Sequence, residues 1–138
     1  MTQDNTSRRT VLAGLCAVAA LGATALTPLA PAEAASAIKV RKDGKVEVRL
    51  AALKKVGAVV RIPTKNAALV RTGPKQYIAY NLACTHMGAP VDPTGSVWVC
   101  PAHGSEYNPR NGDVVRGPAQ APLHRIRVHI AKGIALVR

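Results

Sequence analysis

Two cysteine–histidine pairs carry the clearest chemical signal in this sequence. The members of each pair are closely spaced, and thirteen residues separate the first pair from the second; the motifs are Cys84-Thr85-His86 and Cys100-Pro101-Ala102-His103. Thiolates and imidazoles bind soft and borderline metal ions, and four of them complete either a structural zinc site or the ligand set of a small iron–sulfur cluster. The spacing by itself leaves both interpretations open.

The residues around these pairs strongly resemble the Rieske iron–sulfur family. The resemblance runs through residues 77–123 and includes Cys84-Thr85-His86-Met87-Gly88, Cys100-Pro101-Ala102-His103-Gly104-Ser105-Glu106-Tyr107, Gly117-Pro118-Ala119 and Pro122-Leu123. It implies one [2Fe–2S] cluster per chain, held by the two cysteines on an inner iron and the two histidines on an outer, more exposed iron. Residues 117–119 resemble the proline-containing segment that covers the cluster in this family.

Two hydroxyl residues follow the second motif. The resemblance implies that Ser105 donates a hydrogen bond to a bridging sulfide and Tyr107 one to a ligating cysteine sulfur. Such bonds stabilise the more negative reduced cluster and raise its reduction potential. Rieske centres span about −150 to +300 mV, and we expect the upper half of that interval here.

Ala89 and Ala102 mark a departure from one branch of the family. The quinol-oxidising branch usually has cysteines at these two positions, joined by a disulfide that ties the two ligand loops together. Oxygenase-type ferredoxins also lack this disulfide, but they usually lack the serine and tyrosine as well. The sequence therefore combines features of both branches.

The rest of the chain predicts an all-β protein that presents these motifs on loops. Apolar and polar residues alternate over 46–50 and 126–130, the period of a half-buried strand. Further strands are predicted at 58–62, 67–71, 77–82, 97–99 and 134–137. Asn111-Gly112 predicts a hairpin turn of the primed type, and Lys132-Gly133 a second chain reversal. The expected fold is a small Rieske-type antiparallel β-sandwich with a cluster-binding subdomain made of two loops.

Composition limits the possible functions. The chain has 138 residues and 48% hydrophobic residues, which fits one small folded domain and excludes general disorder. Its net charge is +12, with 19 Lys and Arg against 7 Asp and Glu. This basic surplus is either a solvated face or a surface that attracts an acidic redox partner or an anionic membrane. A nucleic-acid partner is not expected, because the sequence offers no aromatic platform for single strands.

The N-terminal segment resembles a twin-arginine (Tat) export signal. Arg8 and Arg9 precede an uncharged apolar run over 11–30, and small residues follow at Ala32 and Ala34. We therefore divide the chain into a signal peptide at 1–34, cleaved after Ala34, and a Rieske domain at 35–138. The run is also about as long as the ~20 residues that span a bilayer, so an uncleaved membrane anchor remains an alternative.

These features favour a one-electron carrier or subunit of a cytochrome bc-type or other oxidoreductase chain, located on the outer side of the cytoplasmic membrane. Its expected partner is a cytochrome or another oxidoreductase, because so short a chain offers no obvious substrate pocket of its own. Whether the protein is itself an enzyme stays open. One alternative is a ferredoxin-like donor to an oxygenase or exported oxidoreductase. Another is a zinc-stabilised binding module, which would be colourless.

Three further side chains could bind a metal or relay electrons. His124 and His129 have no cysteine nearby, and we interpret both as surface or packing residues. Trp98 lies between two valines just before Cys100 and is expected in the core rather than in an electron path.

Overall fold

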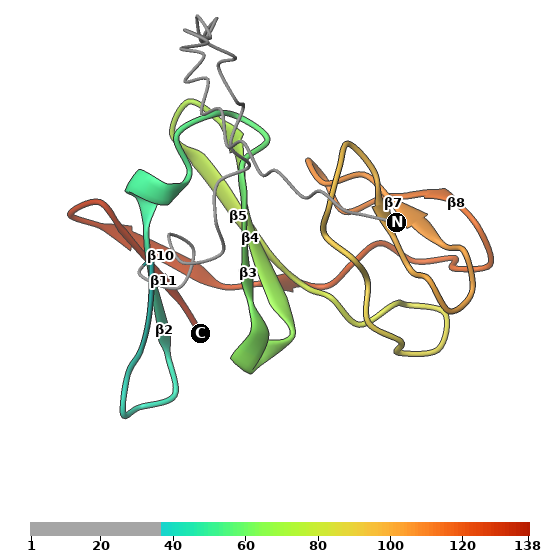
Figure 1. The fold of residues 1–138 in the computed structure, drawn as a ribbon, viewed down its shortest axis with the longest axis horizontal. Coiled ribbons are helices and arrows are strands. Elements are labelled where there is room, and N and C mark those ends of the chain that lie inside the picture. The colour runs from blue at the N-terminus through green and yellow to red at the C-terminus, as the bar shows by residue number, and fades with distance from the viewer. Residues whose placement is uncertain (1–36) are drawn as a thin grey trace, which may run out of the picture.

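The computed structural model describes residues 37–138, and this part of the chain is built from antiparallel strands joined by turns and loops (Figure 1). In chain order the strands are β1 (Ile38–Val40), β2 (Val46–Arg49), β3 (Val59–Ile62), β4 (Ala67–Gly73), β5 (Gln76–Asn81), β6 (Trp98–Val99), β7 (Glu106–Tyr107), β8 (Val114–Arg116), β9 (Arg125–Ile126), β10 (Val128–Ala131) and β11 (Ile134–Val137). Short 3-10 turns occupy Leu50–Ala52 and Pro63–Lys65. The predicted all-β class is confirmed.

The strands form three sheets. An outer sheet has the order β1-β2-β11-β10, a central sheet the order β3-β4-β5-β9, and a small sheet the order β6-β7-β8. In Figure 1 the outer sheet lies on the left, the central sheet in the middle and the small sheet on the right. The outer and central sheets pack as a sandwich, because their facing side chains share one core that includes Val46, Val48, Ile62, Leu69 and Val137.

The central sheet is buried on both faces. Along β4, Ala67 and Leu69 belong to the sandwich core, while Ala68 and Val70 belong to a second core that contains Trp98 and both cysteines. Successive side chains of a strand point to opposite faces, so one strand contributes to both cores. The uninterrupted apolar sequence of residues 67–70 follows from this position, because a strand covered on both sides has no solvated face.

The ligand motifs lie in an insertion between neighbouring strands of the central sheet. Residues 82–123, called the inserted part below, leave the sheet at the end of β5 and return in β9, which pairs with β5 at Ala79 and Tyr80. The remaining described residues, 37–81 and 124–138, are called the sandwich part. Because both ends of the inserted part are held by adjacent strands, the loops stand on a rigid base.

Some local predictions differ from the structure. The predicted strand at 126–130 is divided at Arg127, where the chain passes from the central sheet to the outer sheet. Asn111-Gly112 belongs to a hairpin as expected, but the turn is longer than the two-residue primed type. Gly112 has a φ of +82° whereas Asn111 does not have a positive φ, and the Gly112 N–H donates to the carbonyl of Asn108. Lys132 and Gly133 both have positive φ, as the primed turn requires.

The predicted signal peptide at 1–34, with its apolar run and its cleavage position, lies outside the described residues. Among residues 37–138, no helix has the length and apolar character needed to cross a membrane.

Candidate metal centre

Both ligand motifs are tight loops with the same backbone pattern. In the first loop, residues 84–89, the Cys84 N–H donates to the Ala89 carbonyl at 2.8 Å and the Gly88 N–H donates to the Cys84 carbonyl at 2.7 Å. The second loop, residues 100–105, repeats both bonds at 2.8 Å, from Cys100 N–H to the Ser105 carbonyl and from Gly104 N–H to the Cys100 carbonyl. In both motifs the cysteine therefore lies at the start of a loop that turns the chain back on itself.

A glycine with a left-handed backbone completes each loop. Gly88 has a φ of +76° and Gly104 a φ of +70°, and a Cβ at either position would meet nothing within 4 Å. The requirement for glycine therefore comes from backbone conformation rather than from lack of space.

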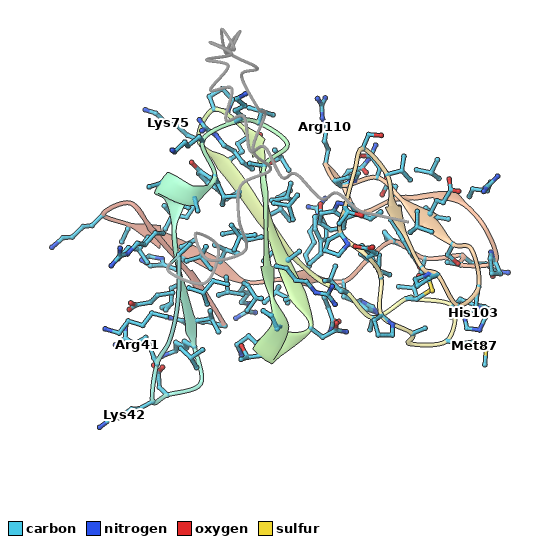
Figure 2. All side chains as sticks on the ribbon, in the orientation of Figure 1. Arg41, Lys42, Lys75, Met87, His103 and Arg110 are labelled. Carbon is cyan, nitrogen blue, oxygen red and sulfur yellow. The ribbon has the colours of Figure 1, made fainter. Side chains whose placement is uncertain are left out.

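The two cysteines are inside and the two histidines outside. Cys84 and Cys100 are 2% and 0% exposed, both are free thiols, and both belong to the same buried core. His86 and His103 are exposed, and their rings meet edge to face with centroids 4.8 Å apart. Figure 2 shows both His103 and the exposed Met87 at the end of the inserted part. The structure thus brings together all four predicted ligands.

The four side chains are arranged as two like pairs. Within residues 37–138, no three His, Cys, Asp or Glu side chains converge closely enough to hold a single metal ion. A mononuclear zinc site needs all of its ligands around one point. A two-iron cluster with mixed ligands needs two thiols at one end and two imidazoles at the other. The donor set and its pairing therefore fit a [2Fe–2S] cluster better than zinc.

The Tyr107 hydroxyl lies beside the sulfur of Cys84. Tyr107 is fully buried in β7, and its hydroxyl is 3.2 Å from Cys84 Sγ. The same hydroxyl accepts a bond from the Thr85 N–H at 3.1 Å and lies 3.0 Å from Thr85 Oγ1. The position of Tyr107 is the one that the expected bond to a cysteine sulfur requires.

Thr85 is a site residue that the sequence reasoning missed. Besides its two contacts with Tyr107, its hydroxyl donates to the carbonyl of Ala121 at 2.6 Å. This side chain therefore joins the first loop to the segment that leads back to the central sheet. Its place between the two ligands of the first motif was the available signal, but the partner Ala121 is 36 residues away in the chain.

Ser105 connects the second loop to the 117–119 segment. Its side chain is fully buried, and its hydroxyl accepts a bond from the Ala119 N–H at 3.3 Å. Gly117, with a φ of +105°, packs so closely that a Cβ there would lie 2.5 Å from the Ser105 Cα. Residues 117–119 thus lie directly against the second loop, as the resemblance predicted for the covering segment.

These contacts change the acidity of the buried thiol. Burial raises the pKa of Cys84, but hydrogen bonds from the Tyr107 hydroxyl, the His86 backbone N–H, Cys100 and Ser105 together outweigh burial and lower the pKa from 9.0 to about 7. Burial and the neighbouring Cys84 raise the pKa of Tyr107, so its hydroxyl keeps its proton. The pocket therefore favours the thiolate form, which is the form that binds metal.

The other candidate side chains lie outside this centre. His124 and His129 are exposed, as expected for surface residues. Trp98 is fully buried and packs edge to face on Tyr80, with ring centroids 5.8 Å apart, so its predicted place in the core is confirmed.

Comparisons with known proteins agree with this geometry. The cytochrome b6-f complex iron-sulfur subunit of Prochlorococcus marinus (strain AS9601) is 43% identical over 60 residues, which cover 42% of this chain and 33% of that protein. The cytochrome b6-f complex iron-sulfur subunit 3 of Nostoc sp. (strain PCC 7120) is 43% identical over 56 residues, 39% of this chain and 31% of that protein. The matched segment thus spans about a third of the length of these relatives.

One solved structure and one family model extend the match beyond that segment. The crystal structure of the plasma membrane Rieske protein PetC3 from Synechocystis PCC 6803 has a TM-score of 0.53 and 31% identity, covering 65% of this chain and 94% of that one. The model of the Rieske [2Fe-2S] domain matches residues 39–129, which confirms the expected [2Fe–2S] cofactor. The chain belongs to the Rieske [2Fe-2S] domain family.

Proposed function

We propose that this protein transfers single electrons through a [2Fe–2S] cluster held by its two loops, as the Rieske component of an exported, cytochrome bc-type chain. The proposed ligands are Cys84 and Cys100 on the inner iron and His86 and His103 on the outer iron. The observation that carries the proposal is the pairing of two buried thiols with two exposed imidazoles.

Each group of residues has a separate task in this function. When bound, the cluster would supply one reversible electron. The cysteines anchor it in the core, where the pocket already favours the thiolate form of Cys84. The histidines reach solvent, so a partner can approach their ring edges while the inserted part stays folded.

The proposed tuning residues are Ser105 and Tyr107. The Tyr107 hydroxyl contacts the Cys84 sulfur and is held by Thr85, and the Ser105 hydroxyl, which helps to lower the pKa of Cys84, is held by Ala119. Donors fixed in this way need little rearrangement when the charge of the cluster changes. The links through Thr85 and Ser105 also hold both loops against the segment from 117 to 121, where a disulfide between positions 89 and 102 is absent.

The proposed partner and location are supported by the relatives and by the N-terminal sequence. Two of the relatives are subunits of cytochrome b6-f complexes and one structure is of a plasma membrane protein, which supports a cytochrome-containing partner and a membrane setting. The paired Arg8 and Arg9 support export by the twin-arginine route, with residues 1–34 as a signal peptide or a retained anchor.

Metal analysis of the full chain, produced with its own export and cluster-assembly systems, tests the function. We expect two irons and two sulfides per chain. The reduced cluster should give a magnetic resonance spectrum typical of mixed cysteine and histidine ligation. His103→Asn should abolish this spectrum, whereas the exposed control His124→Asn should leave it unchanged. A colourless protein that contains zinc, or a cluster that survives His103→Asn, would contradict the proposal.

Export has its own test. Replacing Arg8 and Arg9 together by lysine should leave the protein in the cytoplasm, because the pathway reads the arginine pair itself. The matched control exchanges Arg41 for lysine, which also keeps the charge and lies on the folded domain. Normal export of the Arg8 and Arg9 double variant would refute the twin-arginine assignment.

A further inference from the structure

The charge of this protein is concentrated in the sandwich part. Residues 37–81 and 124–138 contain fifteen Lys and Arg against two Asp and Glu, a net charge of +13. The inserted part, residues 82–123, contains two Arg against three Asp and Glu, a net charge of −1. The basic surplus noted in the sequence is therefore absent from the end that carries the candidate ligands.

Part of this charge lies on the outward face of the outer sheet. Val46, Val48, Ala135 and Val137 fill the sandwich core, so the residues that alternate with them face away from it. By register, this outward face presents Lys39, Glu47, Arg49, Ile134, Leu136, His129 and Ala131. Arg127 and Arg138, which extend the β10–β11 pairing by one residue, continue the face. The half-buried Ile134 and Leu136 form an apolar strip at its centre; Arg49 lies beside Ile134, and Glu47 and His129 lie on either side of Leu136.

Four cations of this face have no carboxylate partner. The side chain of Glu47 is 3.0 Å from Arg41, and the other ion pairs within residues 37–138 involve Arg41, Lys45 and Arg116. None of them involves Lys39, Arg49, Arg127 or Arg138. An external anion is thus the available counter-charge for this face.

Two of these arginines converge on one depression. Arg127 and Arg138 are neighbours across the β10–β11 pair, where the Arg138 N–H donates to the Arg127 carbonyl. With Val128 and His129 they line an open depression of about 290 Å³. Like charges side by side on a sheet repel each other. An anionic group bound between the two arginines would offset this repulsion.

The location of the face argues against a redox partner as its occupant. Figure 2 shows Arg41 and Lys42, beside the outer sheet, at the opposite end of the long axis from His103 and Met87. An acidic electron-transfer partner bound to the outer sheet would be held away from the exposed histidines. A membrane surface bound there would leave the histidines free to face a partner.

We propose that the outward face of the outer sheet binds anionic phospholipid headgroups, with the depression between Arg127 and Arg138 receiving a phosphate. The cations supply long-range attraction, and the central apolar strip suits the boundary between headgroups and acyl chains. The chain also enters this sheet at β1, and seven residues, 31–37, separate β1 from the uncharged run over 11–30. A retained anchor and this face would therefore contact the same membrane.

Vesicle flotation of the full, cluster-loaded chain tests the proposal. The probes are phosphatidylcholine vesicles with and without phosphatidylglycerol. Arg8 and Arg9 beside the apolar run also favour the anionic vesicles, so the preference is assigned to the outer sheet only through the variants of that sheet. We expect stronger binding to the phosphatidylglycerol vesicles and loss of this preference as salt rises, since exposed charges are screened beyond about 10 Å at 0.1 M salt.

Paired variants locate the binding face. R127Q/R138Q should weaken binding to phosphatidylglycerol vesicles by about 30-fold, the expected contribution of two basic residues at an anionic surface. The control K54Q/K55Q removes the same charge from exposed positions outside the outer sheet and should cost far less. Cluster absorbance and melting temperature check that each variant is folded, and K39Q/R49Q tests the same face if the first pair does not fold.

Three results would overturn the proposal. One is equal binding to both vesicle types, and another is an equal loss for R127Q/R138Q and K54Q/K55Q. The third is binding to an immobilised acidic c-type cytochrome that depends on Arg127 and Arg138 while phosphatidylglycerol vesicles are ignored, which would assign the face to a protein partner. None of these results bears on the cluster, so failure here is separate from failure of the proposed electron transfer.

Discussion

The Tyr107 hydroxyl has one proton and two neighbours that can accept it. The Thr85 N–H donates to this hydroxyl, and the Thr85 hydroxyl donates its own proton to the Ala121 carbonyl, which can only accept. The Tyr107 proton therefore goes to Cys84 Sγ at 3.2 Å or to Thr85 Oγ1 at 3.0 Å. With Cys84 as a thiolate ligand, the sulfur is the more negative acceptor, and reduction of the cluster makes it more so.

Tyr107→Phe should therefore lower the reduction potential. A hydrogen bond to a charged group contributes about 1.5–3 kcal/mol, and we take about 1 kcal/mol of this as the difference between the two redox states. For one electron, about 1 kcal/mol corresponds to roughly 40 mV, since a tenfold change in equilibrium constant is about 59 mV. Redox titration followed by the cluster's visible circular dichroism measures the shift. An unchanged or higher potential would refute the assigned direction of this bond.

Thr85→Val provides an internal check of the same reasoning. This variant removes the competing acceptor, so the Tyr107 proton is left to Cys84, and the potential should rise by less than the amount that Tyr107→Phe lowers it. Combined with Tyr107→Phe, the valine should cause no rise, because no proton is left to redistribute. If Thr85→Val shifts the potential equally with and without the tyrosine hydroxyl, Thr85 acts only through packing.

Four further outcomes are expected. The potential of the unmodified protein should fall in the upper half of about −150 to +300 mV, and Ser105→Ala should lower it, whereas an unchanged value would refute the role of that hydroxyl. Gly117→Ala should destabilise the fold by about 2–5 kcal/mol in denaturant unfolding, from a positive φ plus a clash with the second loop. Gly44→Ala shares the positive φ in open space and should cost only about 1–2 kcal/mol, so equal losses would show that the clash is relieved.

Local chemistry made the ligands and the fold class readable from the sequence. A Cys-x-His and a Cys-x-x-His motif, each followed by glycine, contain both the donor atoms and the left-handed residue that closes the loop, all within six residues. Alternation of apolar and polar residues in β2 records that this strand has one buried face. These properties depend on neighbours in the chain, so they are visible without the fold.

Contacts between distant segments were decided only by the tertiary structure. The apolar residues 67–70 predicted a strand but not that both of its faces are covered, because the covering layers come from other parts of the chain. The bond from Thr85 to Ala121 and the packing of Gly117 on Ser105 likewise join residues that the sequence separates. The sequence also carried the full basic surplus, but only folding brought Lys39 and Arg49 onto one face of the outer sheet, because alternating residues of paired strands share a face.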